Sequence, residues 1–277
     1  MYRVFFAFLI IGVCFVLGTL VTRGMDRYRK AHHKTGWTNG KQILLSTGLG
    51  LSFLAVYLII YFSLYYHAFG ETAEYLVSSR DVEVKKRGND YFFDGPGTDT
   101  ALVFYPGGKV QTESYAPLLH KLSEAGIDTF LLDMPLHLAI FGKDRADGVL
   151  QNYSYENWYM SGHSLGGVVA GQFASENRDR LNGLILLAAY PTEALPEELA
   201  FLSIYGSEDQ CLEEDIYEET KRYWPSNGKE YVIDGGNHAM FGNYGPQSGD
   251  GEGRITAEEQ QRLTIDRILE FVENDAG

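Results

Sequence analysis

Two apolar runs near the amino terminus constrain this chain most, because each is long enough for a helix that crosses a membrane. Residues 4–21 contain Thr19 as their only polar side chain, and residues 43–66 are interrupted only by serine and threonine. A helix needs about 20 apolar residues to cross the roughly 30 Å hydrocarbon core of a bilayer. Tyrosines cluster toward the end of the second run, as they do at membrane surfaces. We therefore expect a hairpin of two transmembrane helices, about 4–21 and 43–66, within residues 1–66.

The residues between the two runs are basic, which indicates how the hairpin is oriented. Residues 22–42 hold six Lys or Arg against the single acid Asp26. Positive charge in short loops predicts that this loop is cytoplasmic and that the body after it is extracytoplasmic. Arg3, ahead of the first run, favours the opposite orientation, so a cytoplasmic body stays open. A cleaved signal peptide is the other alternative for the first run, although no small-residue cleavage site follows it.

The rest of the chain is strongly acidic. Residues 1–66 carry a formal net charge of +6 and residues 67–277 one of −20. Nucleic-acid binding needs a basic surface, so we expect no nucleic-acid partner. Two cysteines, Cys14 and Cys211, exclude a disulfide framework and a cysteine zinc cluster. The sequence has no EF-hand, HExxH, Walker or dinucleotide motif, so no cofactor or metal is expected.

From residue 67 on, short apolar runs bounded by turn residues alternate with helical periodicity, which predicts one α/β domain. The first two expected strands flank a turn at residues 87–89 and predict an antiparallel pair, and the others have the length of buried strands. Thr256 and Glu259 form a capping box before the last helix. Strands alternating with helices favour a doubly wound, mostly parallel sheet. The expected strands are 82–84, 91–93, 101–105, 129–132, 158–161, 184–188, 201–205 and 231–233.

The hexapeptide Gly162–Gly167, with the sequence GHSLGG, carries the sharpest chemical signal. It follows an expected strand and precedes the helical stretch 168–175, which is the setting of a nucleophile elbow. In such a turn the serine adopts strained backbone angles, and flanking glycines let strand and helix approach closely. Ser164 would then stand at the carboxyl edge of the sheet, beside a helix amino terminus that favours negative charge. Ser164 is therefore the candidate nucleophile.

A nucleophilic serine needs a base and an acid that orients the base, and candidates for both follow later strands. Asp209 lies in the loop after strand 201–205, and His238 follows strand 231–233. The chain order of serine, acid and histidine is that of one known class of catalytic triads. Glu208 is the adjacent rival for the acid.

The turn after strand 101–105 supplies a candidate oxyanion hole. It reads Pro106-Gly107-Gly108-Lys109, and two glycines there let the backbone come close to a bound carbonyl. The candidate donors are the backbone amides of Gly108 and Leu165, with the amide of Lys109 as the alternative to that of Gly108.

In combination, these motifs resemble the α/β-hydrolase fold family over about residues 72–277. More narrowly, they are similar to a small bacterial subgroup that has an amino-terminal membrane segment. Pro106 stands where many lipases and esterases have a histidine, a departure that leaves the backbone amides intact. The resemblance rests on the stretches Phe104–Val110, Met134–Leu136 with Ala139–Gly142, Gly162–Gly167, Tyr205–Asp209 and Gly235–Gly242.

The resemblance implies a serine hydrolase that acts on a small acyl substrate. It implies Ser164 as nucleophile, His238 as base and Asp209 as acid, with an oxyanion bound by the amides of Gly108 and Leu165. The same constellation would serve ester, thioester or amide bonds. A catalytically silent binding protein at the membrane is the competing reading, because the fold is also used without catalysis.

The sequence leaves little room for a lid over this site. Between strands 184–188 and 201–205 only residues 189–200 are available, about enough for one short helix. The other variable stretch is residues 136–155. A minimal lid predicts an open, shallow site, suited to small or flexible acyl groups or to an exposed bond on a larger molecule. It disfavours an interfacial lipase with a deep acyl tunnel. The membrane segment could also bring the site close to lipid substrates.

Overall fold

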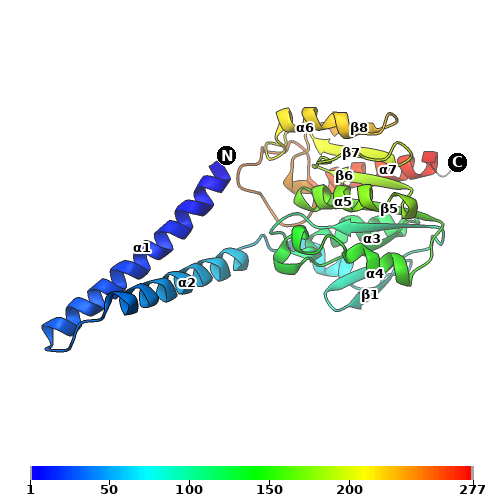
Figure 1. Cartoon of the computed structure of the whole chain (residues 1–277). Helices are drawn as coiled ribbons and strands as arrows, with labels where there is room; N and C mark the ends of the chain where they lie inside the picture. The colour runs from blue at the N-terminus through cyan, green and yellow to red at the C-terminus, as the bar shows by residue number, and fades with distance from the viewer. Residues whose placement is uncertain (1, 276–277) are drawn as a thin grey trace. The chain divides into compact units, whose positions relative to one another are not determined.

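The computed structural model describes residues 2–275, and the chain divides into two compact units, Met1–Leu64 and Tyr65–Gly277. The first unit is a pair of helices, α1 (Tyr2–Ala31) and α2 (Asn39–Ser63). They pack through small residues, because a Cβ on Gly18 would lie only 2.5 Å from the carbonyl oxygen of Ser46. Glycines at such contacts let two apolar helices approach closely. Figure 1 shows the hairpin that the two helices form.

The bounds of these helices differ from the expected spans at the basic segment. α1 continues to Ala31, so four basic side chains expected in the loop belong to its last turns: Arg23, Arg27, Arg29 and Lys30. Arg and Lys are good helix formers, and their charge is favourable near a helix carboxyl terminus. Leu9–Ala31 and Asn39–Ser63, with mean hydropathies of 1.6 and 2.3, are long and apolar enough to cross a membrane.

The second unit is built on one eight-stranded sheet with the order β1-β2-β4-β3-β5-β6-β7-β8. β2 runs antiparallel to both β1 and β4, and all other neighbours are parallel. Every expected strand is present, which confirms the predicted mostly parallel α/β fold. The strands are β1 (Glu83–Arg87), β2 (Asp90–Asp94), β3 (Thr100–Tyr105), β4 (Asp128–Leu131), β5 (Asn157–His163), β6 (Gly183–Leu187), β7 (Ala200–Gly206) and β8 (Lys229–Ile233).

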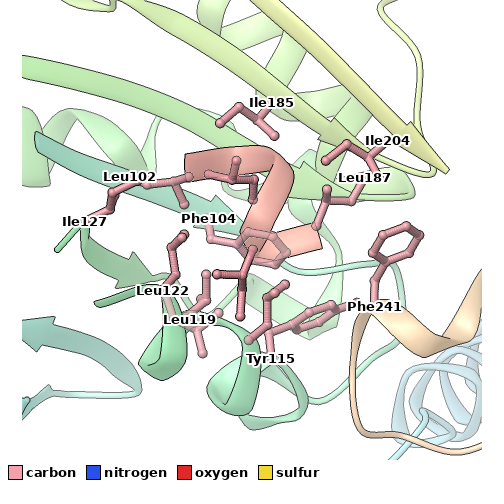
Figure 2. Packing of buried hydrophobic residues seen from close by; sticks show 14 of the residues in the cluster. Leu102, Phe104, Tyr115, Leu119, Leu122, Ile127, Ile185, Leu187, Ile204 and Phe241 are labelled. Atoms are coloured by element: carbon pink, nitrogen blue, oxygen red, sulfur yellow. The ribbon is translucent and has the colours of Figure 1, made fainter. Parts of the chain in front are cut away.

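Helices cover both faces of this sheet (Figure 1). Side chains alternate along each buried strand: Leu102 and Phe104 of β3 pack with α3 and α7, while Val103 packs with α5 on the opposite face. Figure 2 shows the first of these clusters, in which Phe104 lies among leucine and isoleucine side chains of the sheet and of α3. The helices are α3 (Ala116–Glu124), α4 (Arg145–Asn152), α5 (Leu165–Glu176), α6 (Glu214–Thr220) and α7 (Ala257–Asp275).

Short 3-10 turns fill several of the connections between these elements. They are η1 (Gly70–Leu76), η2 (Thr112–Tyr115), η3 (Pro135–His137), η4 (Ala139–Phe141), η5 (Arg178–Arg180), η6 (Lys221–Tyr223) and η7 (Ala239–Phe241).

Two connections bear on the expected lid and the expected cap. Residues 188–199, between β6 and β7, form no helix in the structure, because Pro191 and Pro196 interrupt the short segment. The hydroxyl of Thr256 accepts a hydrogen bond from the amide of Glu259 at 3.1 Å, so the expected cap of α7 is present. Since β3, β5, β7 and β8 are parallel, the loops that follow them emerge at one edge of the sheet.

Candidate active site

Ser164 occupies a sharp turn between β5 and α5. Its backbone angles are φ 52° and ψ −125°, a left-handed φ that is strained for any residue except glycine. The Ser164 amide donates to the Leu187 carbonyl at 3.0 Å, and the Ser164 carbonyl accepts from the Val168 amide at 3.1 Å. The turn is therefore hydrogen-bonded to a neighbouring strand and to its own helix, which hold the strained conformation.

Close backbone packing explains the glycines on both sides of Ser164. A Cβ on Gly162 would lie 2.6 Å from the carbonyl carbon of Gly166, and a Cβ on Gly166 would clash with the carbonyl oxygens of Tyr105 and Pro106. Only glycine lets α5 start this close to β5 and to the turn after β3.

Asp209 and His238 come together at the same edge of the sheet. The Nδ1 atom of His238 lies 2.8 Å from Oδ2 of Asp209, and their side chains are only 3% and 0% exposed. The other carboxylate oxygen of Asp209 accepts from the amides of Cys211 and Leu212, both at 2.8 Å. The Nε2 atom of His238 is buried and has no hydrogen-bond partner among residues 2–275. This atom is therefore available to a group that enters the site.

The rival acid, Glu208, points elsewhere. Its carboxylate pairs with Arg254 at 2.9 Å, and its side chain is 33% exposed. Between the two adjacent acids, the histidine contact therefore belongs to Asp209.

Asp250 joins the acid and base loops, a role that the sequence analysis missed. Its carboxylate accepts from the amides of His238 at 3.2 Å, Ala239 at 2.9 Å and Gln210 at 3.3 Å. Asp250 stands between two glycines in an irregular loop, so neither periodicity nor strand position marks it. Only the tertiary fold brings its carboxylate to the backbone amides of His238 and Ala239.

A buried hydrogen-bond chain links the other loops of the site. The amide of Gly107 donates to the Tyr115 hydroxyl at 3.0 Å, and this hydroxyl lies 2.8 Å from Nδ1 of His163. The Nε2 atom of His163 lies 3.0 Å from the backbone carbonyl of His238. Since Nε2 must donate to that carbonyl, Nδ1 accepts from Tyr115. The chain thus connects the turn after β3, the elbow and the base loop.

Burial keeps both side chains of this chain neutral. Desolvation lowers the pKa of His163 well below its usual value, and the nearby His238 lowers it further. Desolvation likewise raises the pKa of the Tyr115 hydroxyl. Both residues are completely buried. Neither residue is marked as part of the site by the sequence, because a buried hydroxyl contact leaves no sequence pattern.

The turn after β3 brings Gly108 beside the elbow. A Cβ on Gly108 would lie 2.9 Å from Cδ2 of Leu165, so the two residues are neighbours. The amide of Lys109 donates to the carbonyl of His137 at 2.7 Å. The amide of Gly108 makes no hydrogen bond within residues 2–275, and Leu165, the first residue of α5, has no intrahelical partner for its amide.

One group of side chains in the described residues has the composition of a metal site. Ligand atoms of Asp209, Cys211 and His238 lie within 4.8 Å of one another. Two of the three already share a hydrogen bond, and burial raises the pKa of the Cys211 thiol, which disfavours the thiolate that binds metals. Hydrogen bonding accounts for this cluster without an ion.

Comparison with known proteins places this geometry in context. A family model described as "Alpha/beta hydrolase family" matches residues 101–262. The esterase Rv0045c from Mycobacterium tuberculosis has a TM-score of 0.52 at 13% identity, covering 74% of this chain and 97% of its own. Est1E from Butyrivibrio proteoclasticus, solved with ferulic acid bound, has a TM-score of 0.51 at 14% identity, covering 69% and 96%.

A mouse protein, alpha/beta hydrolase domain-containing protein 10, has a TM-score of 0.50 at 12% identity, covering 71% of this chain and 99% of its own. At such identities the likeness to these structures is one of fold. No curated protein sequence matches this chain.

Gly166→Ala tests the close packing at the elbow. The added methyl group would collide with two backbone carbonyls, so we expect the free energy of unfolding to fall by about 2 kcal/mol or more. The control is Gly148→Ala in α4, where a Cβ meets nothing within 4 Å. That variant should gain about 0.5–1 kcal/mol. Urea unfolding measures both changes, and equal stabilities would contradict the packing argument.

Tyr115→Phe tests the buried chain. The variant leaves the Gly107 amide and the His163 ring without their partner, so we expect a loss of about 1–3 kcal/mol in unfolding free energy. Tyr205→Phe is the matched control, because the Tyr205 hydroxyl makes no hydrogen bond in the described part of the chain. Its effect should stay below about 0.5 kcal/mol. Thermal and urea unfolding of both variants check the difference, and a neutral Tyr115→Phe would argue against the chain.

Proposed function

Because the chain belongs to the alpha/beta hydrolase family, we propose that it is a membrane-anchored serine hydrolase that cleaves an ester or related acyl bond. The observation that carries the proposal is the buried pair of Asp209 and His238, 2.8 Å apart, with Nε2 of His238 left without a partner in the described residues. Family membership and fold likeness to esterases support hydrolase activity. The combined motifs support the narrower assignment to the membrane-anchored bacterial subgroup.

In the proposed mechanism Ser164 attacks the acyl carbon and His238 acts as general base. Nε2 of His238 takes the hydroxyl proton as the bond between Oγ and the carbon forms, and the proton then passes to the leaving alkoxide as its bond breaks. Water repeats the sequence on the acyl-enzyme and releases the acid. Asp209 holds Nδ1–H and stabilises the imidazolium, while its other oxygen is bound by two backbone amides.

The oxyanion that forms during each attack needs donors that are in place beforehand. The amides of Gly108 and Leu165 suit this role, because they are neighbours at the elbow and have no partner in the described chain. The amide of Lys109 is the weaker alternative, since the carbonyl of His137 already accepts from it at 2.7 Å. The amino end of α5 adds a favourable electrostatic field for the negative charge.

The proposed anchor is the pair α1 and α2, which together form a two-helix membrane hairpin. Apolar side chains of α2 are strongly exposed in the structure, including Ile43 at 67%, Leu44 at 73% and Ile59 at 66%. A helix of a soluble protein would bury one such face, whereas a bilayer solvates all of them. The basic residues at the hairpin turn favour a cytoplasmic turn and an extracytoplasmic hydrolase body.

Ser164→Ala gives the direct kinetic test of the proposal. Removing the nucleophile should lower kcat for p-nitrophenyl butyrate by about 10⁵- to 10⁶-fold, the loss seen when a triad serine is deleted. Steady-state hydrolysis by the detergent-solubilised full chain measures it. A folded wild-type protein with no turnover of ester, thioester or amide would favour the alternative of a silent binding protein.

Asp209→Asn against Glu208→Gln tests the choice of acid. The amide at position 209 cannot stabilise the imidazolium, so kcat should fall by about 10³- to 10⁴-fold, less than for loss of the serine. Glu208→Gln changes an exposed pair with Arg254 and should stay within about threefold of wild type. A severe Glu208→Gln with a neutral Asp209→Asn would show that the acid is assigned wrongly.

A further inference from the structure

The segment that follows α2 is hydrogen-bonded to the turn beside the elbow. α2 ends at Ser63. Tyr66 then pairs in parallel with Val110, its amide donating to Lys109 at 2.7 Å and its carbonyl accepting from Gln111 at 2.8 Å. An extended residue spans at most about 3.6 Å, so the covalent chain keeps Tyr66 within about 11 Å of Ser63. The candidate oxyanion turn is thus hydrogen-bonded to a residue that follows the end of α2 by three positions.

The same segment also contacts the loop after the base. The amide of Phe69 donates to the carbonyl of Asn243 at 3.1 Å, and the hydroxyl of Tyr66 accepts from the amide of Ser248 at 3.1 Å. The ring of Tyr66 lies 5.6 Å from that of Tyr244. Two loops of the site are therefore held by residues that come immediately after the membrane helix.

Three exposed apolar side chains stand beside this attachment, and we call them the apolar lip: Leu136, Ile140 and Phe141, at 53%, 55% and 54% exposure. The carbonyl of His137 binds the amide of Lys109, and the ring of His137 lies 4.0 Å from that of Tyr65. The lip therefore borders both the candidate oxyanion turn and the first residues after α2.

The backbone is strained at Leu136 of the lip and at the residue that follows it. Leu136 and His137 both have left-handed angles, with φ of 56° and 55°. Non-glycine residues adopt this conformation at an energetic cost, and such residues cluster at functional sites. A hydrophobic side chain kept half exposed on a strained backbone indicates a surface with a ligand of its own.

The segments that form this surface lack charged residues, unlike the rest of the acidic body. Neither residues 64–69 nor residues 134–142 contain an Asp, Glu, Lys or Arg, whereas residues 67–277 as a whole carry a net charge of −20. An uncharged surface with exposed apolar side chains matches the interface of a bilayer. A soluble acyl substrate would not need the exposed lip.

We propose that this site takes the acyl ester of a bilayer lipid, and that the apolar lip contacts the membrane surface and receives the acyl chain. This inference rests on the proposed function, since it names the substrate class of the same site. The connection at residues 188–199, between β6 and β7, is short and contains no helix, so it supplies no helical lid.

The test compares two probes that react with the same serine. The full chain is placed in vesicles of phosphatidylglycerol and phosphatidylethanolamine and treated with a hexadecyl fluorophosphonate in the bilayer or an ethyl fluorophosphonate in water. The measured quantity is the labelling rate with the hexadecyl probe divided by the labelling rate with the ethyl probe. Ile140→Glu should lower this ratio about tenfold, which corresponds to about 1.4 kcal/mol of binding free energy. Ile216→Glu, at an isoleucine 37% exposed on α6, should leave it unchanged.

Leu136→Asn is a second lip variant, chosen because it should not disturb folding. Asparagine suits the left-handed backbone at this position, so the variant should fold at least as well as wild type while it removes an apolar side chain. It too should lower the ratio. Ratios equal to wild type in both lip variants would overturn the proposal and assign the lip to a protein partner or a second copy. Labelling by neither probe in the wild type would instead refute the proposed hydrolase function.

Discussion

The site depends on one buried hydrogen-bond chain that runs from Gly107 through Tyr115 and His163 to the carbonyl of His238. It ties the turn after β3, the elbow and the base loop to a single set of neutral groups. Desolvation keeps the His163 ring uncharged, so the chain can form without burying a charge. Because each link is inaccessible to water, breaking one would leave unpaired polar atoms in the core. These hydrogen bonds thereby fix the positions of three loops that are far apart in the sequence.

The fold was predictable where the sequence carries local patterns. Eight short apolar runs predicted the eight strands, and Thr256 before Glu259 predicted the start of α7. The end of α1 was not predictable from hydropathy, because the helix continues through residues that are basic but still favour helix. A short helix between β6 and β7 was allowed by length, but two prolines prevent it.

The candidate site divides in the same way. Ser164, Asp209 and His238 follow strand ends with glycine-rich turns, so position and residue type marked them. The sequence named Asp209 as the acid with Glu208 as its rival, and in the structure Asp209 contacts Nδ1 of His238 while Glu208 pairs with Arg254. Tyr115 and Asp250 act through contacts that cross more than ten residues of sequence. No single-sequence pattern reports such contacts.

The first residues after the proposed anchor contact the turn after β3. Tyr66 pairs with residues on both sides of Val110, next to the glycines proposed to bind the oxyanion. Residues 65–69 belong to the compact unit of the hydrolase body, so the support they give the site is part of that unit. In this account the exposed lip follows from where the substrate resides.

Mass spectrometry of the full chain after reaction with a fluorophosphonate tests the central claim most directly. An activated serine would form a bond from its Oγ atom to phosphorus and release fluoride. The account predicts one adduct, on the peptide that contains Ser164, and its loss when His238 is replaced by alanine. An unmodified folded protein, or an adduct on another serine, would contradict it.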